Sequence, residues 1–496
     1  MEAPFLTRLQ QVHLGISPTG LTTVSSHEGT PDLYEKENDA LQARLLRLCS
    51  SHLWPHDSHD AACPRPILWA PQHQEQLATL HTALATALTD VVERWWVDSE
   101  AKFPARMPLE KAEEDMLRWL DTQNIPYRNR LGSWRPDFLV EEDSASPEGV
   151  ENFRITEINA RFSFNGTMHV LHGQAALESL GAGENGITHA TDTKKIVEGL
   201  LSLFDPERPM HLLKGTEPGM DIHMFIDFLG RHLGIKPRLI TPDDLRLVHS
   251  PEGQNGYKLC CLVQSEDIDV FPFAPRLHTS DGKLVEEIQQ VGLELHQREL
   301  FAMEPEMLRQ VITRCFNDMR TVLLVHDKRM LGILKQEIPS LVARNVLTPT
   351  HGEALTKGIA DTILPGSPEM QRLIQACQED GEQRKQYLLK PVRGGKGAGI
   401  LFGDQLDAEG WQCILERLRD ATLHKNCTNY VVQRYVPPAL YDLIISASGE
   451  RHRMPLVGTY HAASGQLLGL GIWRTSSNRI CAVSNGGSWI CSVMAP

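Results

Sequence analysis

The sequence predicts an α+β fold divided into two or three packed lobes. Three observations lead to this expectation. The chain has 496 residues, which exceeds the length of about 250–300 residues at which a single hydrophobic core stops growing. Helical and strand-like hydrophobic periods both occur, and the last third of the chain mixes helices with strands instead of alternating them strictly.

Residues 1–105 are expected to form a helical cap or substrate-binding region. The clearest helical period lies between residues 74 and 96, where apolar side chains recur at helical spacing. These side chains are Leu77, Leu80, Leu84, Leu88 and Val92.

Residues 106–205 are expected to contain two antiparallel strands. Short β-compatible runs lie at 134–140 and 153–159, on either side of an acidic segment at 141–151. This segment contains proline and glycine, which favour an exposed connection between the two strands.

Residues 206–319 are expected to form a small α/β lobe. A strand at 211–213, a helix at 221–233 and a strand at 237–240 follow one another, as parallel strands require. The first turn of this lobe lacks a glycine-rich dinucleotide signature, so no nicotinamide site is predicted.

Residues 320–496 are expected to form lobes with antiparallel strands, and the nucleotide site is predicted here. The expected strands cover 321–325, 387–392, 430–435, 442–448 and 456–461, and the expected helices cover 329–342 and 408–421.

The composition argues against polyanionic partners. The formal net charge is −14, whereas nucleic acids and anionic membranes are bound through clustered Lys and Arg. Residues 1–17 contain no continuous apolar h-region, and no stretch of about 18 apolar residues occurs. Export and membrane spanning are therefore not expected, and the cytoplasm is the default location. The ten cysteines include no C-x-x-C pair and are expected to be reduced thiols. A homodimer is compatible with the sequence.

A glycine-rich loop follows a predicted strand that ends near Lys390. Backbone N–H groups of such a loop can close around phosphate oxygens, because glycine has no Cβ and accepts positive φ. The spacing is not that of a Walker A loop. The candidate phosphate-binding residues are Lys390, Gly394, Gly395, Lys396, Gly397 and Gly399.

A second nucleotide-binding element is predicted at residues 430–436. This apolar strand carries Gln433 and Tyr435 and runs into the pair Pro437–Pro438, which suits an interdomain hinge. Adenine needs an apolar slot with backbone donors and acceptors at its edge, and a strand entering a hinge supplies both.

These elements resemble the ATP-grasp superfamily. The resemblance lies in a lysine at the start of a helix, Lys328, a strand lysine before a glycine loop, Lys390, and a hinge strand with Gln433. It implies that the two lysines contact the phosphates of ATP and that Gln433 and its neighbours border the adenine. It also implies that the small α/β lobe at 206–319 is similar to a pre-ATP-grasp domain.

The usual ATP-grasp order places the magnesium ligands after the hinge, but few acids remain there. Only Asp442 and Glu450 follow Gln433, and residues 451–496 contain no acidic residue. Magnesium requires hard oxygen ligands, so the ligands are expected upstream.

Suitable residues lie on the two strands predicted near residue 150. Arg135 and Asp137 share one face of the first strand, and Glu157 and Asn159 share one face of the second, because side chains alternate along a strand. One hairpin can therefore present all four groups to a single point.

This order resembles the glutathionylspermidine synthase and trypanothione synthetase type of circularly permuted ATP-grasp ligase. The resemblance implies that Asp137, Glu157 and Asn159 hold Mg²⁺, with two ions expected and Mn²⁺ able to replace them. It assigns charge stabilisation at the reacting acyl centre to Arg135. Arg474, after the glycine run at 468–474, would face phosphate or a substrate carboxylate. No amidase module is evident.

The sequence therefore predicts an ATP-dependent ligase that forms an amide bond from a small-molecule carboxylate and an amine. Two alternatives stay open. One is a phosphotransferase on the same fold, which would form a phosphorylated product in place of free phosphate. The other is a non-catalytic nucleotide-binding protein, in which the early acidic residues would not converge with Lys390.

Overall fold

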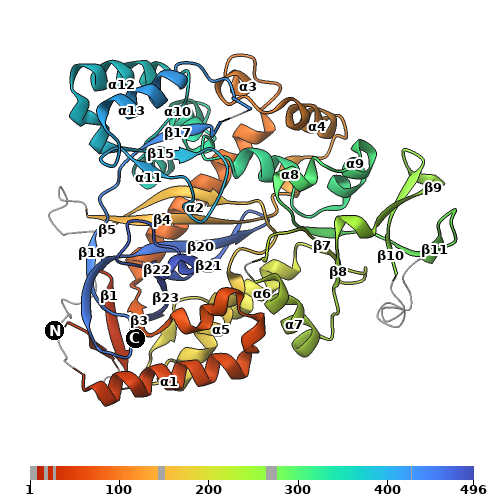
Figure 1. Ribbon diagram of the computed structural model, residues 1–496. Coiled ribbons are helices and arrows are strands. Elements are labelled where there is room, and N and C mark those ends of the chain that lie inside the picture. Colours follow the sequence, from red (N-terminus) through yellow and green to blue (C-terminus); the bar gives the residue numbers. More distant parts are fainter. Residues whose placement is uncertain are drawn as a thin grey trace.

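The computed structural model of the protein describes residues 8–15, 21–25, 29–142, 151–219, 221–263, 276–425 and 427–495. It has a mixed α+β architecture around one large sheet, as the sequence predicts (Figure 1). Most of the predicted acidic loop at 141–151 lies outside the described residues.

The central sheet has ten strands, and its main order is β2-β1-β3-β23-β22-β20-β4-β5, with β21 beside β20 and β6 beside β23. Strands from both ends of the chain therefore share one sheet, and β23 runs parallel to β3. The bounds are β1 Gln10–Leu14, β2 Leu21–Thr23, β3 Ala62–Leu68, β4 Ser133–Glu142, β5 Glu151–Asn159, β6 Thr188–His189, β20 Val457–Ala463, β21 Gln466–Leu470, β22 Trp473–Thr475 and β23 Ser488–Met494.

The N-terminal region differs from the expected helical cap. It does contain helices, α1 (Pro31–Leu48) and α2 (Pro71–Glu93), and α2 covers the predicted period at 74–96. It also supplies β1, β2 and β3 to the central sheet. The sequence of β3, ACPRPIL, does not read as a strand because it contains two prolines and an arginine, Arg65, which is buried in the structure.

Two hydrophobic cores lie on opposite faces of the central sheet. Successive side chains of a strand point to opposite faces, and in β23 Trp489 and Cys491 enter one core while Ile490 enters the other. The core that contains Ile490 includes α2. The core that contains Trp489 and Cys491 includes α1, α5 (Thr167–Leu177), α6 (Thr193–Leu201) and α7 (Ile222–Leu233).

A second sheet of four strands has the order β14-β17-β15-β16 and lies above the central sheet in Figure 1. The predicted strands of the glycine-loop and hinge regions are confirmed as β15 (Tyr387–Pro391) and β17 (Tyr430–Arg434), which pair antiparallel. The other two strands of this sheet are β14 Thr362–Ile363 and β16 Leu401–Phe402. The helices of this part of the chain are α10 Met330–Ala343, α11 Pro349–Gly358, α12 Pro368–Glu379 and α13 Ala408–Arg417.

Within residues 206–319, β7 (His211–Lys214) pairs parallel with β8 (Arg238–Ile240) and with β13 (Val291–Glu294). A separate antiparallel arm extends beyond these strands, at the right of Figure 1. The strands of the arm are β9 Leu245–Gln254, β10 Tyr257–Leu262, β11 Arg276–His278 and β12 Leu284–Glu287. The remaining elements of the chain are α3 Phe103–Arg106, α4 Lys111–Asp121, α8 Gln297–Leu300, α9 Pro305–Arg314, β18 Leu440–Ile444 and β19 Arg451–Pro455.

The strand predicted at 321–325 is wrong. Thr321–Val325 forms one π-helical turn, and all five side chains are buried. A short continuous apolar run fits a buried helical turn as well as a buried strand, and the hydrogen bond of 2.8 Å between the Thr321 and Tyr127 hydroxyls holds this turn inside the protein.

Two further expectations can be compared with the structure. No helix in the described part of the chain is long and apolar enough to span a bilayer. All ten cysteines are unpaired thiols, and eight of them are buried.

Gly458→Ala is expected to destabilise the central sheet. A Cβ at Gly458 would lie 2.3 Å from the Phe138 ring and 2.7 Å from the Trp473 ring, and such overpacking costs about 1–3 kcal/mol. Gly395→Ala is the matched control, since a Cβ there meets nothing within 4 Å. Urea unfolding measures both variants, and equal stabilities would contradict the packing described here.

Candidate active site

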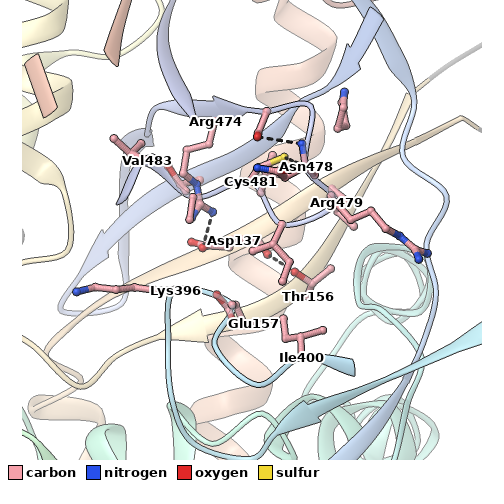
Figure 2. Close-up of a pocket in the computed structure, with 18 of the residues that line it drawn as sticks. Asp137, Thr156, Glu157, Lys396, Ile400, Arg474, Asn478, Arg479, Cys481 and Val483 are labelled. Atoms are coloured by element: carbon pink, nitrogen blue, oxygen red, sulfur yellow. Dashed lines mark hydrogen bonds and ion pairs between the residues drawn. The ribbon is translucent and has the colours of Figure 1, made fainter. Parts of the chain in front are cut away.

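A cavity of about 470 Å³ lies between the central sheet and the four-stranded sheet (Figure 2). Ten of the fourteen residues predicted from the sequence line it: Arg135, Asp137, Glu157, Asn159, Lys390, Lys396, Gly397, Gln433, Tyr435 and Arg474. The other four, Lys328, Gly394, Gly395 and Gly399, lie outside its lining.

The early hairpin is formed by β4 and β5. Asp137 lies directly opposite Glu157, and Arg135 lies opposite Asn159. The register between β4 and β5 shifts after Asp137, since the next residue, Phe138, pairs with Ile155. Thr156 therefore has no partner on β4 and forms a β-bulge. The bulge reverses the alternation, so Phe153 and Ile155 face the hydrophobic core while Glu157 and Asn159 face the cavity.

Two arginines hold the Asp137 carboxylate. Arg135 Nε donates to Asp137 Oδ1 at 2.9 Å, and Arg474 Nη2 donates to Asp137 Oδ2 at 2.6 Å, from β22. Figure 2 shows the Arg474 guanidinium directed at Asp137. Arg135 also donates to the carbonyl of Asn165 at 2.9 Å. These charge-assisted bonds fix both guanidinium groups at the cavity wall.

Lysines and arginines hold Glu157 in its ionised form. Lys328 Nζ lies 3.4 Å from Glu157 Oε2 and also donates to the Gly394 carbonyl at 2.7 Å. Burial alone would raise the pKa of Glu157, but four nearby cations outweigh it and hold that pKa well below its usual range. These cations are Lys328, Lys390, Arg474 and Arg135.

The side chain of Lys390, on β15 of the four-stranded sheet, reaches the bulge of β5 next to Glu157. Its Nζ donates to the Thr156 carbonyl at 3.1 Å, and Gln433 Nε2 donates to the same carbonyl at 3.2 Å. Burial lowers the pKa of Lys390 to about 8, although Glu157 opposes this shift. β15 and β17 are thereby joined to the bulge of β5.

The glycine-rich loop adopts in part the positive-φ backbone that its glycines permit, and Lys396 also has a positive φ. Gly394, Gly397 and Gly399 have positive φ, where glycine is strongly favoured, whereas Gly395 does not. Lys396 Nζ bonds to Glu217 Oε1 at 2.9 Å, so the loop is connected to the segment before α7.

An apolar region of the cavity contains residues that the sequence analysis missed: Leu139, Leu388, Ile400, Phe402, Met454 and Val457. The Arg479 guanidinium lies 3.9 Å from the centre of the Phe402 ring and 5.2 Å from that of Tyr435. Leu388 could have been found by alternation from Lys390, because both lie on β15. Nothing in the pattern indicates Phe402 or Arg479.

The whole chain is similar to known proteins. Residues 80–324 match the family described as the AnkG N-terminal domain. The ATP-grasp enzyme ankG of Aspergillus thermomutatus is 35% identical over 488 residues, which cover 98% of this chain and 100% of that protein.

A solved structure has the same fold. The glutathione synthetase-like effector GSS30 from Globodera pallida, in its apo form, has a TM-score of 0.54 at 12% identity and covers 94% of this chain and 98% of that chain. The predicted ATP-grasp resemblance is confirmed, whereas the likeness to the glutathionylspermidine synthase type stays a prediction. The chain belongs to the ATP-grasp enzyme family that includes ankG.

Proposed function

We propose that the protein is an ATP-dependent ligase that joins a carboxylate to an amine through an acyl phosphate and releases ADP and phosphate. Family membership supports ATP-dependent ligase chemistry in general. The C–N bond, the acyl phosphate and the circularly permuted order of the elements are our proposals, as are a small-molecule substrate pair and a cytoplasmic location.

One observation carries the proposal, namely the charge balance around Glu157. Two carboxylates, Asp137 and Glu157, are surrounded by four cations, Arg135, Lys328, Lys390 and Arg474. The local excess of positive charge in this cavity suits a polyanion such as the triphosphate of ATP. The apolar region at Leu388, Phe402 and Tyr435 suits an adenine.

The donor set also fits Mg²⁺. Asp137 and Glu157 offer carboxylate oxygens from directly opposed positions, and Asn159, next along the same face and also lining the cavity, offers an amide oxygen. Hard oxygen donors are the ligands that this ion prefers. When bound, Mg²⁺ would neutralise phosphate charge and act as a Lewis acid on the transferring phosphoryl group.

The chain's own residues then act by positioning and electrostatics. Lys390 neutralises charge on the phosphates while the substrate carboxylate attacks the γ-phosphorus and ADP leaves. Arg135 and Arg474, held by Asp137, face the acyl centre and stabilise the negative charge that develops there. The loop around Lys396 excludes water, which would hydrolyse the acyl phosphate.

The proposal is tested by a screen of amino acids, short peptides and amines for Mg²⁺-dependent release of ADP and phosphate, followed by mass measurement of the product. A ligase gives free phosphate and an amide. A phosphorylated product would assign the protein to the phosphotransferases, and the absence of ADP release with every pair would favour a non-catalytic nucleotide-binding protein.

Glu157→Gln is expected to lower kcat on the order of a hundredfold or more, because it removes a negatively charged oxygen from the magnesium site. Glu141→Gln is the matched control. Glu141 lies on β4 outside the cavity and pairs with Arg154 at 2.6 Å, so its activity should match wild type. Circular dichroism checks that both variants fold, and a fully active Glu157→Gln enzyme would refute the metal assignment.

The pKa of Lys390 predicts a pH dependence. Below about pH 8 this lysine is charged and attracts the triphosphate, and above it the charge is lost. Therefore kcat/KM for ATP, which reports the free enzyme, should fall as the pH rises through about 8.

Lys390→Arg is the matched variant for this profile, since arginine stays charged throughout that range. Its kcat/KM for ATP should show no decline near pH 8, whatever its absolute value. A wild-type profile that is flat between about pH 7 and 9 would contradict the proposed role of Lys390.

A further inference from the structure

The wall of the cavity continues past the proposed magnesium residues to side chains that this mechanism does not use. They are Ser58, His169 at the beginning of α5, and His461 on β20. All three are buried, and all three line the cavity.

His461 lies next to Arg135 on the sheet. β20 pairs with β4 through Thr459 opposite Asp137 and Ala462 opposite Trp134. The same register places His461 opposite Arg135, and alternation puts it on the cavity face together with Thr459. Its side chain is only 2% exposed, and its Nε2 has no hydrogen-bond partner in the described structure.

His169 adds a second such nitrogen. Its Nε2 lies 2.9 Å from Ser58 Oγ, and the rings of Trp54 and Trp489 pack edge-on against it. Its Nδ1 has no partner among the described residues, although the residue is only 4% exposed. Buried polar atoms are nearly always paired, so two histidines that each keep an unpaired ring nitrogen and that line the same cavity are candidate contacts for a ligand.

The electrostatics indicate the class of this ligand. Burial lowers the pKa of His461 to about 3 and that of His169 to about 4, and Arg135 contributes in both cases. Both rings are therefore neutral at physiological pH, and a neutral imidazole offers a lone pair to a donor. The same burial and positive field disfavour an ammonium ion, whereas an uncharged amine brings N–H donors without charge.

We propose that His461 and His169 bind the amine substrate in its neutral, nucleophilic form beside Arg135. This inference rests on the proposed function. The amine nitrogen donates its lone pair to the acyl carbon, the bond from that carbon to the phosphate oxygen breaks, and the amine proton leaves with the phosphate as hydrogen phosphate. The two imidazoles position the nitrogen and select the neutral form.

Binding is tested by NMR of the full chain labelled with ¹⁵N-histidine, in the presence of ADP and Mg²⁺. The probes are the twenty amino acids, putrescine and spermidine, and His461→Leu assigns the resonance. At least one amine should shift the His461 and His169 signals saturably. His172 is the internal control, since it is 3% exposed with both ring nitrogens unpartnered but does not line the cavity.

If no amine shifts the His461 signal, or if the His172 signal shifts equally, the inference is wrong. This outcome does not depend on turnover, so it is separate from a failure of the proposed function.

Kinetics give a second readout. His461→Leu should raise KM for the amine about tenfold, the loss expected for one hydrogen bond, while KM for ATP is unchanged. His461→Gln, whose side-chain amide can replace Nε2, should bring KM for the amine most of the way back to the wild-type value. The Leu variant removes an unpaired buried nitrogen, so its Tm should not fall.

Hydroxamate formation at high hydroxylamine concentration traps the acyl phosphate and separates the two proposals. Equal trapping in wild type and His461→Leu, together with an unchanged KM for the amine, would overturn the inference but leave the proposed function standing. Absence of hydroxamate from the wild-type enzyme with every carboxylate would refute the proposed function.

Discussion

The β-bulge at Thr156 is the constraint on which the candidate site depends. Phe153 and Ile155 face the hydrophobic core, and strict alternation would turn Glu157 and Asn159 to that same face. An ionised carboxylate in an apolar core is strongly disfavoured. By inserting one residue, the bulge moves Glu157 into the cavity opposite Asp137, and the Thr156 carbonyl becomes the acceptor for Lys390 and Gln433.

Charge compensation then connects segments that are distant in the sequence. Asp137 bonds to Arg474 across 337 positions, and Glu157 pairs with Lys328. Breaking one partner of a buried ion pair leaves an uncompensated charge, which is strongly destabilising. The network connects the two sheets, and the excess of cations over carboxylates is the feature that the proposed function uses to bind a triphosphate.

Much of the site could be predicted from the sequence because its signals are local. The pairs at Arg135–Asp137 and Glu157–Asn159 follow from strand alternation, and Lys390 precedes a glycine loop. The bulge could not be predicted, since it depends on which face of β5 packs in the core. Lys328 lies behind Glu157 and contacts the Gly394 carbonyl, and only the fold shows this. β3 and His461 were missed because their roles depend on strand neighbours far along the chain.

The most direct test of this account is a crystal structure of the protein with Mg²⁺ and a non-hydrolysable ATP analogue. The account predicts the triphosphate between Lys390 and the Asp137–Glu157 pair, with the adenine against Phe402 and Tyr435. Nucleotide density elsewhere, with Asp137 and Glu157 still held only by their arginine and lysine partners, would contradict it.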